Sequence, residues 1–186
     1  MQKSPITFSS PGLFTTGIGQ LVIARFKGGG RVELGVFLLD VYCLGVKNAF
    51  YSKCTDAELD GLLERFFAGE GEIEKHSGAW GRKLVEGAVN YARQLGFAPH
   101  RDYKMAARVM GGIDPKSCPD RFVFGQNGKP LFVAGPHEDE ARCQLIMNVL
   151  TRKCGVGGFD YLIPIRDPGD ISDEESFGDE EEGGEK

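Results

Sequence analysis

The stretch Gly35–Phe50, GVFLLDVYCLGVKNAF, is the most apolar part of the chain and constrains its fold more than any other. If it is extended, apolar side chains line both of its faces, which is typical of a covered strand in the centre of a sheet. The strand-forming residues 20–26 precede it, and Gly28–Gly30 supplies a tight reversal between the two segments. The sequence therefore predicts a hairpin of about residues 20–26 and 31–43.

Asp40 is the one acidic residue inside this apolar stretch. An ionised carboxylate buried in a strand costs several kcal/mol unless it is paired, hydrogen-bonded or bound to a metal. One interpretation is structural, with Asp40 accepting backbone N–H groups or pairing with Lys47 or an arginine. The other is a catalytic or ligand-binding role. We favour the structural interpretation.

Capping residues and apolar spacing predict about four helices. Their expected bounds are Thr55 to Gly69, Ser77 to Gly96, Pro99 to about Met110, and about His137 to Lys153.

A second hairpin is predicted from short apolar segments on either side of an Asn-Gly turn. Its strands would be Phe122–Phe124 and Leu131–Val133, and Phe159–Ile165 would add an edge strand. Strands and helices come in groups and do not strictly alternate. This order predicts an α+β fold in a single domain, with an antiparallel sheet of two hairpins and about four helices packed on it.

Composition divides the chain into three parts. Residues 1–18 are rich in Ser, Pro, Gly and Thr and are expected to form a flexible N-terminal arm. Residues 19–165 form the predicted domain, and 166–186 a disordered acidic tail. Residues 1–165 hold 20 Lys and Arg against 17 Asp and Glu, whereas residues 166–186 hold 2 against 10. A nearly neutral body gives little electrostatic reason for strong binding to nucleic acid.

Several classes of protein do not fit the sequence. No apolar run is long enough to predict a membrane span, and no apolar signal segment follows the N-terminus, so a cytoplasmic protein is expected. The 5 cysteines are spread without a Cys-x-x-Cys pair, which is typical of reduced thiols. We therefore expect no disulfide and no cysteine-bound zinc. Because no motif dictates a chemistry, no cofactor is expected either.

Three segments together resemble a group of uncharacterised bacterial proteins, some of which carry a C-terminal SEC-C zinc knuckle. The segments are GVFLLDVYCLGVKNAF, LVEGAVNYARQLGFAPHRDY and FVFGQNGKPLFVAGP, and the similarity covers roughly Gly19 to Leu150. The group has no established activity to carry over. The Cys-x-Cys of the knuckle is absent here, so the resemblance implies no zinc.

Pro99–Tyr103, PHRDY, gathers an imidazole, a guanidinium, a carboxylate and a phenol. His100 and Asp102 could act with Asp40 as acid and base around a cleft, with or without a divalent metal on oxygen ligands. The same residues could instead be a helix cap, which we favour. Cys43 could be a nucleophile beside His100, but packing explains a cysteine on a buried strand better.

The segment from Arg93 to Arg121 is the one locally basic part of the chain. If its cations share a face they could contact phosphates, whereas scattered solvated charges are the simpler interpretation. The candidate binding residues are Arg93, Arg101, Tyr103, Lys104 and Arg108.

Two functions remain open. The first is a non-enzymatic interaction or accessory module of a bacterial macromolecular system, which binds another protein or a nucleoprotein, with nucleic acid alone a less supported partner. The alternative is a small hydrolase- or nuclease-like enzyme that uses Asp40, His100 and Asp102. The acidic tail could assist or regulate binding, or only raise solubility.

Overall fold

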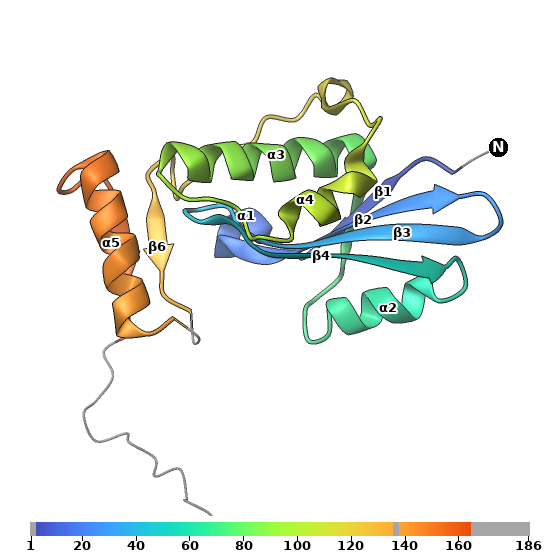
Figure 1. Ribbon diagram of the computed structural model, residues 1–186, viewed down its shortest axis with the longest axis horizontal. Helices are drawn as coiled ribbons and strands as arrows, with labels where there is room; N and C mark the ends of the chain where they lie inside the picture. Colours follow the sequence, from blue (N-terminus) through green and yellow to red (C-terminus); the bar gives the residue numbers. More distant parts are fainter. Residues whose placement is uncertain (1–2, 136–137, 165–186) are drawn as a thin grey trace, which may run out of the picture.

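A five-stranded antiparallel sheet forms the centre of the computed structural model, which describes residues 3–135 and 138–164 (Figure 1). The predicted acidic tail, residues 166–186, lies outside the described residues. The strand order across the sheet is β4-β3-β2-β1-β5. The strands are β1 (Ile6–Ser9), β2 (Ile18–Lys27), β3 (Arg31–Asp40), β4 (Gly45–Thr55) and β5 (Glu74–Ser77).

Helices cover both faces of this sheet (Figure 1). The long helix α3 (Gly78–Gln94) lies on one face together with α4 (Tyr103–Ala106), and α2 (Leu59–Phe66) lies on the other. Short helical turns complete the body, namely α1 (Leu13–Thr16), η1 (Ala107–Met110) and η2 (Pro115–Ser117).

The strand β3 is covered on both sides, as its two apolar faces predict. Phe37 and Leu39 are fully buried in a core shared with α3, while Val36 belongs to a second core shared with α2. β2 pairs with β3 without interruption from Ile18 opposite Asp40 to Lys27 opposite Arg31. The predicted hairpin is therefore confirmed, and its second strand ends at Asp40.

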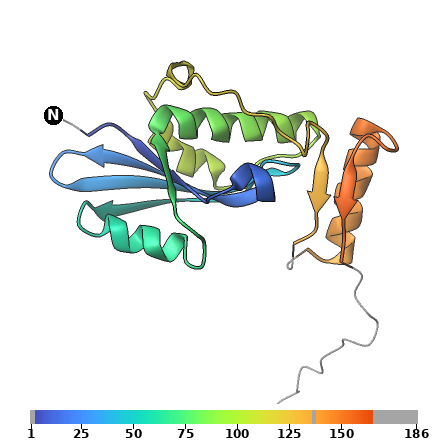
Figure 2. The same ribbon diagram turned by 180° about the vertical axis from the view of Figure 1, so that it is seen from behind.

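A smaller C-terminal lobe stands at the end of the sheet where β3 turns into β4 (Figure 1). It consists of β6 (Leu131–Val133), α5 (Glu140–Cys154) and β7 (Asp160–Leu162). Figure 2 shows β6 and β7 side by side, and the two strands are parallel. Cys43 and Leu44, in the turn between β3 and β4, share a buried cluster with this lobe. That cluster joins the lobe to the body.

The α+β class and the single domain are confirmed, but the N-terminal arm is corrected. β1 pairs with β2 on one side and with β5 on the other. Thr7 and Ser9 are fully buried, and the Thr7 hydroxyl donates to the carbonyl of Ser77. Pairing on both sides satisfies the backbone polar groups of this short segment, which its Ser- and Pro-rich composition did not indicate.

The second predicted hairpin is also corrected. Asn127 and Gly128 do have positive φ, 53° and 82°, as the Asn-Gly turn requires. Only one isolated bridge, between Gln126 and Lys129, follows from that turn. Residues 122–124 form no strand, because their phenylalanines pack on the body instead, and β6 pairs in parallel with β7.

Candidate binding groove

Asp40 holds the turn that follows β3. Its Oδ1 accepts hydrogen bonds from the backbone N–H groups of Tyr42, at 2.9 Å, and Cys43, at 2.8 Å. Burial raises the pKa of this carboxyl group, while backbone hydrogen bonds and the charge of Lys47 act against the rise. Backbone N–H groups are thus the partners of Asp40, as the structural interpretation expected.

His100 and Asp102 lie beside each other, as their places in the sequence require. The backbone N–H of Asp102 donates to His100 Nδ1 at 3.3 Å, and the side chains are 28% and 55% exposed. The carboxylate of Asp40 is buried in its own turn, and within residues 3–135 no hydrogen bond or ion pair joins it to either group. The catalytic trio therefore stays a prediction that no contact supports.

The environment of Cys43 disfavours a nucleophilic role. The side chain is fully buried in the cluster that joins body and lobe. Burial and the nearby Asp40 raise the pKa of the thiol, whereas a nucleophilic cysteine needs a lowered pKa. Packing accounts for this residue.

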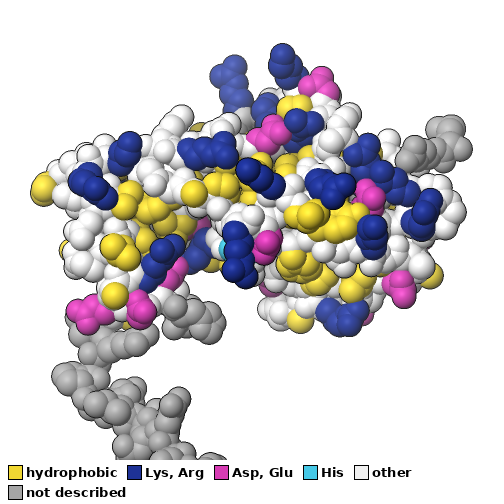
Figure 3. Space-filling view, in the orientation of Figure 1, with side chains coloured by type: hydrophobic (Ala, Val, Ile, Leu, Met, Phe, Trp, Pro, Cys, Tyr) yellow, Lys and Arg dark blue, Asp and Glu magenta, His cyan; other side chains and the backbone are white. Residues whose placement is uncertain are grey.

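Four of the predicted binding residues are exposed cations, which we call the cationic strip: Arg93, Arg101, Lys104 and Arg108. Arg101 lies just before α4, Lys104 in α4 and Arg108 in η1, and Lys and Arg side chains are spread across the face of the molecule shown in Figure 3. Tyr103 differs from the strip, because its ring is half-buried and lies 6.4 Å from that of Phe37. Burial also raises the pKa of its phenol.

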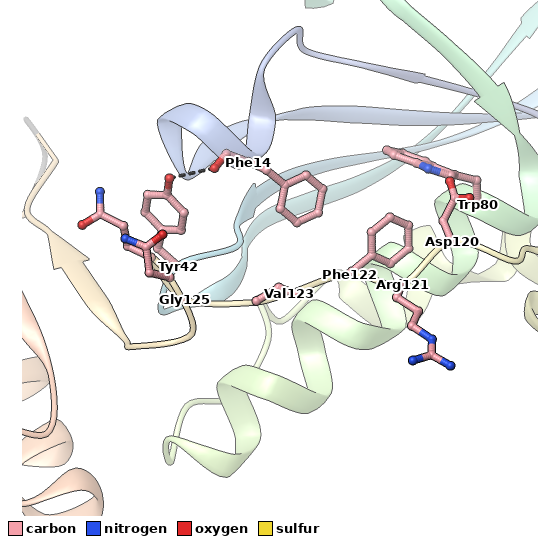
Figure 4. A pocket seen from close by; sticks show the side chains of 10 residues that line it. Phe14, Tyr42, Trp80, Asp120, Arg121, Phe122, Val123 and Gly125 are labelled. Carbon is pink, nitrogen blue, oxygen red and sulfur yellow. Dashed lines mark hydrogen bonds between the residues drawn. The ribbon is translucent and has the colours of Figure 1, made fainter.

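An open groove of about 710 Å³ lies elsewhere on the body, where four distant segments meet (Figure 4). α1, the turn after β3, the first turn of α3 and residues 120–127 contribute to it. Its lining consists of Phe14, Tyr42, Trp80, Asp120, Arg121, Phe122, Val123, Gly125, Gln126 and Asn127.

Aromatic rings form a continuous row along this groove. Phe14 stacks on Phe122 with 5.7 Å between ring centroids and 6° between planes. Trp80 meets Phe122 almost at a right angle, 89°, at 5.3 Å. His76 extends the row by stacking on Trp80 at 3.7 Å. The offset stack of Phe14 on Phe122 and the perpendicular contact of Trp80 with Phe122 are the favourable arrangements for ring pairs.

Local hydrogen bonds fix the segments that carry these rings. The hydroxyl of Tyr42 lies 2.7 Å from the carbonyl oxygen of Phe14, which ties α1 to the turn after β3. The Ser77 hydroxyl accepts from the backbone N–H of Trp80 at 3.2 Å and so caps α3, as predicted. The backbone N–H of Gly125 donates to Val41 at 2.9 Å. The groove is therefore built on restrained backbone.

His76 has a carboxylate and a hydroxyl nearby, but they are not arranged as a catalytic relay. Ser9 Oγ and Glu74 Oε2 both lie 3.3 Å from the same ring nitrogen, Nε2. A relay needs the nucleophile and the orienting acid on different nitrogens of the imidazole, which is itself the base. Ser9 is also fully buried, so His76 serves the aromatic row and not a nucleophile.

The sequence did not predict this groove. Phe14 was assigned to the arm, Trp80 to the apolar face of a helix and Phe122 to a strand. The only signal in the sequence was that each of three separate segments carries an aromatic residue, one of them at the start of a helix. Only the fold shows that these segments meet.

Comparison with protein-family models, curated proteins and solved structures gives no match. The resemblance to an uncharacterised bacterial group therefore stays a prediction. No helix within the described residues is both long and apolar enough to cross a bilayer. The same residues contain no group of three or more His, Cys, Asp or Glu side chains that could hold a metal ion.

Proposed function

We propose that this chain is a non-enzymatic interaction module that binds a peptide segment of another protein in the aromatic groove. The observation that carries the proposal is the row of Phe14, Phe122 and Trp80 along an open groove of about 710 Å³. A volume of this size is typical of binding sites, and rigid aromatic side chains are common anchors of protein interfaces.

Apolar side chains are left in solvent at this place. Phe14 is 37% exposed and Val123 66% exposed, and both line the groove. Apolar surface that gathers in a concave site and is rimmed by polar residues is typical of a partner interface. The carboxylate of Asp120 and the amide groups of Gln126 and Asn127 supply such a rim.

A nucleoprotein partner is the second form of this proposal, and the cationic strip supports it. Arg101, Lys104 and Arg108 are exposed along one short stretch, where they could contact phosphates while the groove holds protein. This form of the proposal adds a surface that contacts phosphates, and the groove still binds the peptide segment.

A displayed library of random peptides, selected on the full chain, tests the groove. Enriched peptides are titrated against the chain, and their affinity is compared between two exposed-valine variants, Val123→Asp in the groove and Val156→Asp outside it. Val123 is 66% exposed and Val156 96% exposed, so both substitutions are compatible with folding. We expect Val123→Asp to weaken binding roughly tenfold or more, and Val156→Asp to leave it unchanged. Equal binding by both variants would overturn the proposal.

A further inference from the structure

One corner of the groove combines two perpendicular rings with a carboxylate. Trp80 and Phe122 meet at 89°, and Asp120, two residues before Phe122 in the chain, lines the same groove (Figure 4). His76 stacks on one face of Trp80 and Phe14 on one face of Phe122, and the remaining ring surface of this pair lines the groove. Aromatic faces carry partial negative charge, so they and the carboxylate attract the same kind of ligand.

No positive group among the described residues pairs with the negative charge of Asp120. Within residues 3–135 and 138–164 this exposed carboxylate makes no ion pair and no hydrogen bond, whereas Glu138 pairs with Lys47 and Asp56 with Lys3. The neighbouring Arg121 forms no ion pair with it, and the Arg121 side chain points away from Phe14 and Phe122 (Figure 4). The Asp120 carboxylate can therefore pair with a positive group of a ligand.

We propose that this corner binds the basic side chain of a peptide segment, with arginine preferred over lysine. The proposal rests on the proposed function, in which the groove is the surface that binds the partner, and it names the chemistry of the residue that anchors there. A guanidinium group can stack flat on an aromatic face while it forms two hydrogen bonds with a carboxylate. An ammonium group gains the attraction to the rings and the charge, but not the planar stacking.

The charge also argues against two other ligands. A phosphate group would meet the unpaired carboxylate of Asp120, and like charges at close range repel. A purely apolar side chain would fill the corner but leave that carboxylate without a partner. A nucleotide and an apolar probe are therefore informative competitors in the test.

Trp80 is the single tryptophan of the chain, so its signal reports on the groove directly. In the experiment, the indole N–H resonance of the full-length chain is followed by NMR while small probes are added. The probes are the N-acetyl amides of arginine, lysine, leucine and glutamate, and adenosine monophosphate. We expect a saturable shift with the arginine probe, a weaker one with lysine, and none with glutamate or the nucleotide.

Asp120→Asn removes the charge and keeps the shape of the side chain. Because Asp120 is exposed and makes no contact that folding needs, this variant should fold normally. We expect its affinity for the arginine probe to fall roughly three- to tenfold, as for loss of one exposed charge contact together with its hydrogen bonds. Asp60→Asn, which changes the same charge in the first turn of α2, is the matched control and should bind like the unmodified chain.

Two results would overturn the inference: Asp120→Asn binding the arginine probe as tightly as the unmodified chain, or the leucine or nucleotide probe binding in its place. If the leucine probe binds there, the groove still holds an amino-acid side chain, so the proposed function survives and only the chemistry named here fails, whereas a nucleotide in the groove would count against both. If Val123→Asp leaves the binding of displayed peptides unchanged, the proposed function fails, and the arginine-binding corner fails with it.

Discussion

The ammonium group of Lys47 lies 2.7 Å from the carboxylate of Glu138, and this ion pair joins the sheet to the C-terminal lobe. Lys47 belongs to β4, and Glu138 lies just before α5. Both side chains are largely buried, 18% and 13% exposed, and the same carboxylate also accepts from the backbone N–H of Gly135. Together with the apolar cluster around Cys43, the pair fixes the lobe on the body.

Glu138→Gln should lower the free energy of unfolding by about 1–3 kcal/mol, because it leaves a largely buried ammonium group without its charged partner. Chemical denaturation near neutral pH measures the loss. Glu140→Gln is the control, since Glu140 is exposed in the first turn of α5 and should change stability by only a few tenths of a kcal/mol. An equal loss in both variants would contradict the role given to the pair.

The same pair predicts a pH dependence of stability. Burial raises the pKa of Glu138, but the hydrogen bonds from Lys47 and Gly135 outweigh burial and hold the pKa below its usual value. A lowered pKa in the folded state gives stability that is present above the unfolded pKa of about 4.3 and is lost as the pH falls through the folded pKa. The difference between the unmodified chain and Glu138→Gln should therefore be full above about pH 5 and shrink at lower pH. A gap that stays constant down to about pH 2 would contradict this.

Asp40→Ala should destabilise the protein by about 1–3 kcal/mol, because it leaves the buried N–H groups of Tyr42 and Cys43 without an acceptor. Asp40→Asn keeps an acceptor oxygen and should lose less. Thermal or chemical denaturation of both variants distinguishes hydrogen bonding from charge. If Asp40→Asn loses as much as Asp40→Ala, the negative charge and not the acceptor holds the turn.

Asp40 also shows how much of the structure could be predicted from the sequence. Its isolation among apolar residues predicted correctly that the carboxylate needs a partner, and burial explains why that partner lies within the turn. The pattern placed it inside a strand, whereas β3 ends at Asp40 and β4 begins at Gly45. β4 was not predicted, because Lys47, Asn48 and Ser52 interrupt its apolar residues at the exposed edge of the sheet.

The groove was beyond prediction for a different reason. Phe14, Trp80 and Phe122 are far apart in the chain, and each was explained locally as arm, helix face or strand. Their contact depends on β1 pairing inside the sheet, which brings α1 near the start of α3, and on residues 120–127 crossing the same place. Local sequence patterns predict individual helices and strands, but a site assembled from four segments depends on how the whole chain folds.

Gly17→Ala should destabilise the protein by about 2–4 kcal/mol. Gly17 has a φ of 81°, and an added Cβ would collide with the ring of Tyr42, which holds α1 at the groove. Gly29→Ala is the matched control, since Gly29 has a similar φ of 72° and nothing lies within 4 Å of a Cβ at that position. Unfolding experiments on both variants test the contact, and equal stabilities would show that α1 is not held there by Tyr42.

Deleting residues 167–186 should strengthen binding to a short nucleic acid at low salt. The deletion removes ten acidic residues against one lysine, so long-range repulsion of phosphates falls while the cationic strip remains. Titration of a labelled oligonucleotide at about 0.05 M salt measures the gain, which should disappear above about 0.3 M because the interaction is screened. Unchanged affinity at low salt would exclude an inhibitory effect of the acidic segment.

The location of that binding is tested in the shortened chain by charge reversal. Reversing Arg101, Lys104 and Arg108 to glutamate should abolish the gain, because these exposed cations would supply the phosphate contacts. The control reverses three exposed cations of α5, Arg142, Arg152 and Lys153, which changes the net charge by the same amount. If both triple variants lose binding equally, net charge alone governs the interaction. If only the first does, the cationic strip is a surface in its own right, separate from the aromatic groove.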